Sequence, residues 1–147
     1  ILHAAYQHTP STNLLSFYHS NLSMRDEVRN WFEQSKEDLR GAHVALDGDV
    51  YHNAVFQAHQ ATEKALKAYI LQENRELEKG HSLVKLAEKA GYDKLGGIRD
   101  LNPEYLTTRY PDMAVGTPAD SYDEDLAERH ISTAEDVIQW VTNKLSE

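Results

Sequence analysis

Two lysines in the segment from Asn53 to Ile70 are the first candidates for binding chemistry. Lys64 and Lys67 are three positions apart, so a helix would place both ammonium groups on one side. They continue a polar stripe at steps of four and three, made of Asn53, Gln57, Gln60, Lys64 and Lys67. Because ammonium groups bind phosphate, we predict that Lys64 and Lys67 contact a nucleotide. The alternative is that their stems cover apolar surface while their charges stay in water.

A second polar group lies in the sequence RYPD, which begins at Arg109. A guanidinium can hold a phosphate through two hydrogen bonds, and a phenol ring can stack on a base. We therefore predict that Arg109 and Tyr110 complete the nucleotide site. The alternative is that Arg109 pairs with Glu63 inside the fold, because a buried arginine needs an acidic partner.

The eight histidines do not suggest a metal site. His52 and His59 share a predicted helix, but their spacing of seven places them about 10 Å apart along its axis. One ion cannot be bound by both. The chain has no cysteine, no glycine-rich phosphate loop and no serine nucleophile elbow. We predict neither a metal nor a cofactor.

The segment that carries the lysines has a second, apolar side. Its alanines recur at steps of four and three, which places them along one line of a helix: Ala54, Ala58, Ala61, Ala65 and Ala68. Small side chains allow another helix to approach closely. The segment therefore predicts a helix, from Tyr51 to about Gln72, that packs on one side and presents polar groups on another.

Further helices are predicted on both sides of this segment. Residues 24–46 form an amphipathic helix, and Asp47 to Asp49 supply the turn after it. Ser82 can cap a third helix that ends at Gly91. Gly96 and Gly97 should interrupt the chain before a short helix over residues 98–108.

A last long helix is expected near the C-terminus, capped by Asp120 or Ser121. No segment alternates with the period of a strand. Without a sheet, each helix must bury its apolar face against another helix. The sequence therefore predicts an all-α fold, an antiparallel up-and-down bundle of four to five helices.

Composition narrows the class of protein. A length of 147 residues fits one domain, and a net charge of −9 argues against binding to duplex DNA. No apolar run approaches the roughly 18 residues of a membrane span. The lack of cysteine fits a reducing compartment, so we predict a cytoplasmic protein.

Residues 1–23 contain no Asp, Glu, Lys or Arg. We expect them to be an N-terminal extension outside the domain of residues 24–147, because termini are often poorly ordered. The alternative is a short helix packed against the domain through the apolar side chains Leu14, Leu15, Phe17, Tyr18 and Leu22.

Three motifs together resemble the HEPN family of small prokaryotic helical proteins: QATEKALKAYI from Gln60, HSL from His81 and TRYPD from Thr108. The resemblance covers about Met24 to Ser146. It implies a helical bundle that usually forms a homodimer and is often encoded beside a minimal nucleotidyltransferase. Nucleotide binding has been proposed for the family.

One branch of this family consists of metal-independent ribonucleases that act as toxins in toxin–antitoxin pairs. They carry an Arg followed, after four to six residues, by a His. Arg75 and His81 have such a gap here, but they flank the loop before the third helix. The structural alternative is that His81 orients the start of that helix and Arg75 lies in a solvated loop.

We therefore predict a dimeric nucleotide-binding module that acts as the companion of a nucleotidyltransferase. The first alternative is an endoribonuclease toxin that cleaves RNA with Arg75 and His81. The second is a structural assembly partner.

Overall fold

The computed structural model describes residues 23–103 and 117–147. Regular structure in these two ranges is entirely helical, which confirms the predicted all-α class. The elements are α3 (Met24–Asp47), α4 (Tyr51–Asn74), α5 (Leu83–Ala90), α6 (Leu95–Leu101), the 3-10 helix η2 (Pro118–Ser121) and α8 (Glu124–Leu145). None of these helices is long and apolar enough to cross a membrane.

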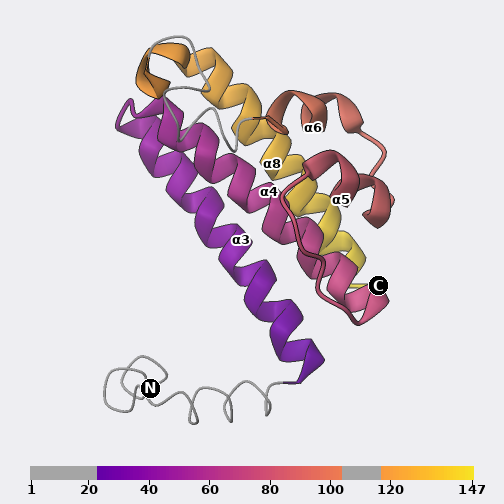
Figure 1. The fold of residues 1–147 in the computed structure, drawn as a ribbon. Helices are drawn as coiled ribbons and strands as arrows, with labels where there is room; N and C mark the ends of the chain where they lie inside the picture. Colours follow the sequence, from indigo (N-terminus) through magenta and orange to yellow (C-terminus); the bar gives the residue numbers. More distant parts are fainter. Residues whose placement is uncertain (1–22, 104–116) are drawn as a thin grey trace, which may run out of the picture.

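The long helices α3, α4 and α8 lie side by side, and the short helices α5 and α6 cover one flank of α4 and α8 (Figure 1). The chain runs along α3 and back along α4. It returns through the segment that contains α5 and α6, and α8 then runs in the direction of α4 (Figure 1). This course confirms the predicted up-and-down bundle.

The α3–α4 hairpin is bounded by local signals. The hydroxyl of Ser23 accepts a hydrogen bond from the Asp26 N–H at 3.1 Å, which caps the first turn of α3. The turn after α3 contains Asp49 with a φ of 60°. Aspartate tolerates this left-handed conformation better than most residues. The two helices therefore reverse direction within three residues, as predicted.

Helix α4 lies at the centre of the fold. Its five aligned alanines are fully buried, as predicted: Ala54, Ala58, Ala61, Ala65 and Ala68. Neighbours on several sides, α3, α5 and α8, pack against α4. The absence of bulky side chains along this line allows that close approach, and the polar side of α4 is thereby fixed relative to α3 and α5.

Helix α5 begins and ends where the sequence predicted. The Ser82 hydroxyl accepts from the Lys85 N–H, and Gly91 ends the helix with a φ of 84°. Glycine adopts this conformation without steric cost.

The predicted interruption at Gly96 and Gly97 is wrong, because both residues lie inside α6. At Gly97, a Cβ would lie 2.6 Å from the Oγ1 of Thr133 on α8. Glycine is thus required for close contact between α6 and α8. The remainder of the predicted helix, residues 104–108, lies outside the described residues.

The predicted cap of the last helix is also wrong. Asp123 caps α8, and its Oδ1 accepts from the Leu126 N–H at 2.8 Å. Asp120 instead accepts a hydrogen bond from the Thr117 hydroxyl at 2.8 Å and so closes η2. The separate 3-10 turn shifts the start of α8 beyond both predicted caps.

Candidate functional site

A buried carboxylate, Glu63 on α4, connects two elements. Its side chain is 5% exposed, and its Oε2 lies 3.0 Å from the Nζ of Lys67 one helical turn later. Both carboxylate oxygens lie 3.1 Å from the Nδ1 of His81, in the connection before α5. The charge of Glu63 is thereby balanced within the fold, and His81 is fixed against α4.

His59 lies on the other side of Glu63. It is fully buried, and its Nδ1 is 3.9 Å from Glu63 Oε1. Burial lowers the pKa of His59 to about 4, although the nearby Glu63 charge opposes this effect. His59 is therefore neutral at pH 7.

A second ion pair joins α3 to α4. The Nζ of Lys64 lies 2.5 Å from Asp38 Oδ2, and Gln34 Nε2 donates to Asp38 Oδ1 at 2.9 Å. Asp38 is buried and Lys64 is partly buried. The ammonium group of Lys64 is therefore held at the line where the two helices meet.

A groove of about 260 Å³ opens beside this ion pair. Asn30, Trp31 and Gln34 of α3 line it together with Lys64 of α4. We call it the α3–α4 groove. The Nζ of Lys67 lies 5.7 Å from the centre of the Trp31 ring, within the range of a cation–π contact. The groove combines an aromatic surface, two amides and a cation.

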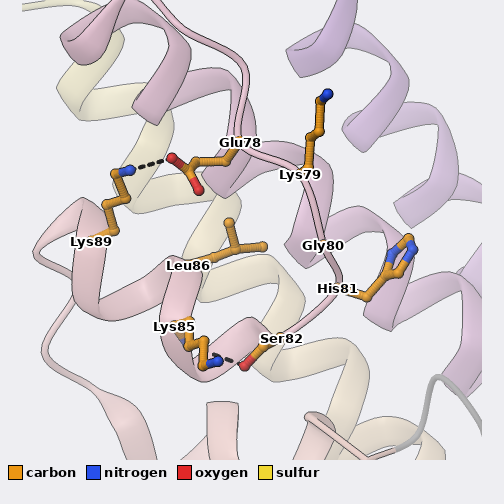
Figure 2. Close-up of a pocket in the computed structure, with 8 residues that line it drawn as sticks. All are labelled: Glu78, Lys79, Gly80, His81, Ser82, Lys85, Leu86 and Lys89. Atoms are coloured by element: carbon orange, nitrogen blue, oxygen red, sulfur yellow. Dashed lines mark hydrogen bonds and ion pairs between the residues drawn. The ribbon is translucent and has the colours of Figure 1, made fainter.

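A second hollow, of about 380 Å³, lies between α5 and the connection that precedes it (Figure 2). We call it the α5 hollow. Most of its lining is polar or charged: Glu78, Lys79, Gly80, His81, Ser82, Lys85, Leu86 and Lys89. Lys89 forms an ion pair with Glu78 across it. The hollow is therefore a separate candidate site.

The structure separates the two lysines predicted to contact a nucleotide. Lys64 lines the α3–α4 groove, whereas Lys67 is 6% exposed, is not part of the groove lining and lies over the Trp31 ring. Arg109 and Tyr110 lie outside the described residues, so their assignment stays a prediction. Within the described residues, Glu63 pairs with Lys67 and His81.

The proposed ribonuclease pair receives different local roles. Arg75 ends α4 in a left-handed conformation with a φ of 59°, and its N–H donates to the Leu71 carbonyl at 2.8 Å. His81 instead contacts Glu63. Catalysis by Arg75 and His81 stays a prediction. In residues 23–103 and 117–147, no group of three His, Asp or Glu side chains could hold a metal ion.

Four residues of the groove and its ion pair were not found from the sequence: Asn30, Trp31, Gln34 and Asp38. Trp31 and Gln34 are three positions apart, and Gln34 and Asp38 four, so these three lie on one side of α3. This spacing could have indicated a shared polar side of α3. It does not indicate a binding site without Lys64, which is 26 residues beyond Asp38 in the chain.

Comparison with known proteins agrees with this architecture. Residues 28–145 match the HEPN domain family. The crystal structure of TT1696 from Thermus thermophilus is 31% identical in sequence, with a TM-score of 0.73 over 80% of this chain and 97% of that chain. ST0689, described as an archaeal HEPN homologue, is 33% identical, with a TM-score of 0.69 over 80% and 96% of the two chains. No curated protein matches the chain.

Proposed function

Because this chain belongs to the HEPN domain family, we propose that it is a nucleotide-binding helical module and that the α3–α4 groove is its site. One observation carries the proposal. The indole of Trp31, the amides of Asn30 and Gln34 and the ammonium group of Lys64 line a single groove. Nucleotides present the complementary groups, namely a flat base, hydrogen-bonding edges and a phosphate chain.

The chemistry assigns a role to each side chain. A base stacks on Trp31, whose ring is supported by the Lys67 ammonium group 5.7 Å away. The amides of Asn30 and Gln34 can donate to and accept from the edge of the base. Lys64 then meets the phosphates, and Arg109 and Tyr110 are predicted to add contacts from the RYPD segment.

The size of the groove indicates which part of the ligand it can hold. A volume of about 260 Å³ is slightly below the range of about 300–1,000 Å³ that is typical of small-molecule sites. The groove therefore has room for the base alone, and the phosphates extend outward past Lys64. Asp38 competes with the phosphates for Lys64, which limits the affinity.

The family supports a further part of the proposal. HEPN proteins usually form homodimers and often accompany a minimal nucleotidyltransferase, so we assign both properties to this chain. The mass of the purified protein in solution, measured alone and with such a partner, tests this assembly.

Nucleotide binding is tested by calorimetric titration of the full chain with each of the four nucleoside triphosphates. We expect Trp31→Ala to weaken binding by about 1–3 kcal/mol, the usual worth of a base stacked on an aromatic ring. Lys64→Gln should also weaken binding, and its amide can still donate to Asp38. The matched control is Lys36→Gln, an exposed lysine on α3 that pairs with Glu33.

Two results would contradict the proposal. One is a wild-type chain that binds none of the four nucleotides. The other is unchanged affinity in both groove variants while their thermal unfolding shows an intact fold.

A further inference from the structure

The α5 hollow gathers positive charge in an acidic protein. Lys85 and Lys89 are one helical turn apart on α5, and Lys79 lies on the connection that forms the opposite wall (Figure 2). The whole chain carries a net charge of −9. Cations collected in a hollow focus the local potential and attract small anions that the remaining surface repels.

These cations are not equally available. Lys89 is already paired with Glu78. Figure 2 shows the Lys79 side chain extending away from Lys85 and Lys89, and the His81 ring turned to the far side of the connection. Lys85 is exposed and forms no ion pair with a carboxylate among the described residues. Lys85 is therefore the principal cation for a ligand, and Lys89 becomes a second one if Glu78 is displaced.

The start of α5 itself is not a source of anion binding. The side-chain oxygen of Asn102 accepts from the N–H groups of Leu83 at 2.7 Å and Val84 at 3.3 Å. The Ser82 hydroxyl accepts from the Lys85 N–H. These first-turn donors already have acceptors, so any anion in the hollow must be held mainly by the lysine side chains.

From this arrangement, we propose that the α5 hollow binds the phosphate groups of a small anionic ligand through Lys85 and Lys89, with Glu78 as an internal competitor for Lys89. The volume of about 380 Å³ lies within the usual range for small-molecule sites. A ligand with two linked phosphates can engage both lysines, because they are four positions apart on one side of α5. This site does not depend on the α3–α4 groove.

Pyrophosphate is the appropriate probe, because it carries the proposed chemistry without a base. We expect the full-length wild-type chain to bind it at one saturable site with a Kd below about 1 mM at low ionic strength. A separate titration of Trp31→Ala, in which the α3–α4 groove is weakened, with a nucleoside diphosphate tests whether the hollow also accepts phosphates that belong to a nucleotide. The nucleoside diphosphate should also bind at the α5 hollow.

The variants give opposite expected changes. Lys85→Gln should weaken pyrophosphate binding about tenfold, since a hydrogen bond to a charged group contributes about 1.5–3 kcal/mol. Glu78→Gln should strengthen it, because Lys89 is released from its ion pair. Lys144→Gln, on α8 and outside the lining of the hollow, is the control and should leave the Kd unchanged.

Three outcomes would overturn the proposal: no saturable binding of pyrophosphate by the wild-type chain, equal weakening by Lys85→Gln and Lys144→Gln, or weaker binding in Glu78→Gln. The pyrophosphate test does not depend on whether the α3–α4 groove binds a nucleotide. If Trp31→Ala bound pyrophosphate but not the nucleoside diphosphate, the hollow would take free phosphates and not those of a nucleotide.

Discussion

Glu63 shows how a single buried charge can hold several elements together. Its carboxylate balances Lys67 on the same helix and anchors His81 from the connection before α5. Lys67 also supports the Trp31 ring of α3. A charge at this depth is tolerated only while its partners remain, because an unpaired buried ion loses its hydration without compensation.

We predict that Glu63→Gln destabilises the protein by about 3 kcal/mol, because the buried Lys67 ammonium group loses its counter-ion. The free energy of unfolding, measured by urea denaturation, tests this value. Lys67→Met should recover part of the loss when it is added to Glu63→Gln. The double-mutant cycle should therefore give a coupling energy of about 0.5–3 kcal/mol.

The exposed pair of Glu33 and Lys36 on α3 supplies the control, since Glu33→Gln should cost no more than about 1 kcal/mol. An equal effect of the Glu33 and Glu63 substitutions would show that burial of Glu63 does not matter. Strictly additive effects of Glu63→Gln and Lys67→Met would show that the two charges are independent.

The sequence was sufficient to select residues of the candidate site that share one helix. Lys64 and Lys67 could be placed on one side of α4 because helical spacing determines the face. Their different surroundings could not be derived. Asp38 and Trp31 come from α3, and only the packing of α3 on α4 decides that Lys64 lines the groove and that Lys67 lies over the Trp31 ring.

At the level of the elements, the contact between α6 and α8 depends on a missing side chain. A Cβ at Gly97 would lie 2.6 Å from Thr133 Oγ1 and 3.2 Å from Thr133 Cγ2. We predict that Gly97→Ala destabilises the protein by about 1–3 kcal/mol, because the helices must separate or Thr133 must leave its rotamer. Thermal and urea unfolding of the variant measure the loss.

A neighbouring glycine gives a direct control. A Cβ at Gly96 would meet no atom within 4 Å, so Gly96→Ala should stabilise α6 by about 0.5–1 kcal/mol. Adding Thr133→Ala to Gly97→Ala removes the two nearest atoms and should restore much of the lost stability. Equal effects of the two glycine substitutions would contradict a specific contact between α6 and α8.

The contrast between α5 and α6 explains how far the fold could be predicted. Ser82 and Gly91 bound α5 through local hydrogen bonds and backbone conformation, so sequence signals sufficed. Gly96 and Gly97 suggested a break, but α6 continues through them because packing against α8 offsets the poor helix propensity of glycine. Local patterns determined the bounds of α5, whereas tertiary contacts determined those of α6.

At the scale of the whole molecule, two buried histidines link stability to pH. Burial lowers the pKa of His59 and of His130 to about 4 in the folded protein, against about 6.5 for an exposed histidine. For His59 on α4, the charge of Glu63 raises the pKa, whereas His81 and His130 lower it further. For His130 on α8, Arg129 acts with burial and Asp100 opposes it.

The sign of the effect follows from these pKa values. Below pH 6.5 these histidines become protonated in the unfolded chain, whereas in the folded protein they stay neutral down to about pH 4. Protonation therefore favours unfolding in this pH range. The contribution of the neutral histidines is complete above pH 6.5 and is lost as the pH falls toward 4. For His59 the loss is on the order of 1 kcal/mol per pH unit in this window.

We therefore predict that the free energy of unfolding, measured by urea denaturation, decreases steadily from pH 7 to pH 5, where ordinary carboxylates are still mostly ionised. His59→Gln should reduce this slope, whatever its effect on stability at pH 7, because the variant lacks the titrating group. His130→Gln provides the same measurement if the first variant does not fold. Equal slopes in the wild-type chain and both buried variants would show that these histidines do not couple folding to pH, and that acid sensitivity arises from other groups.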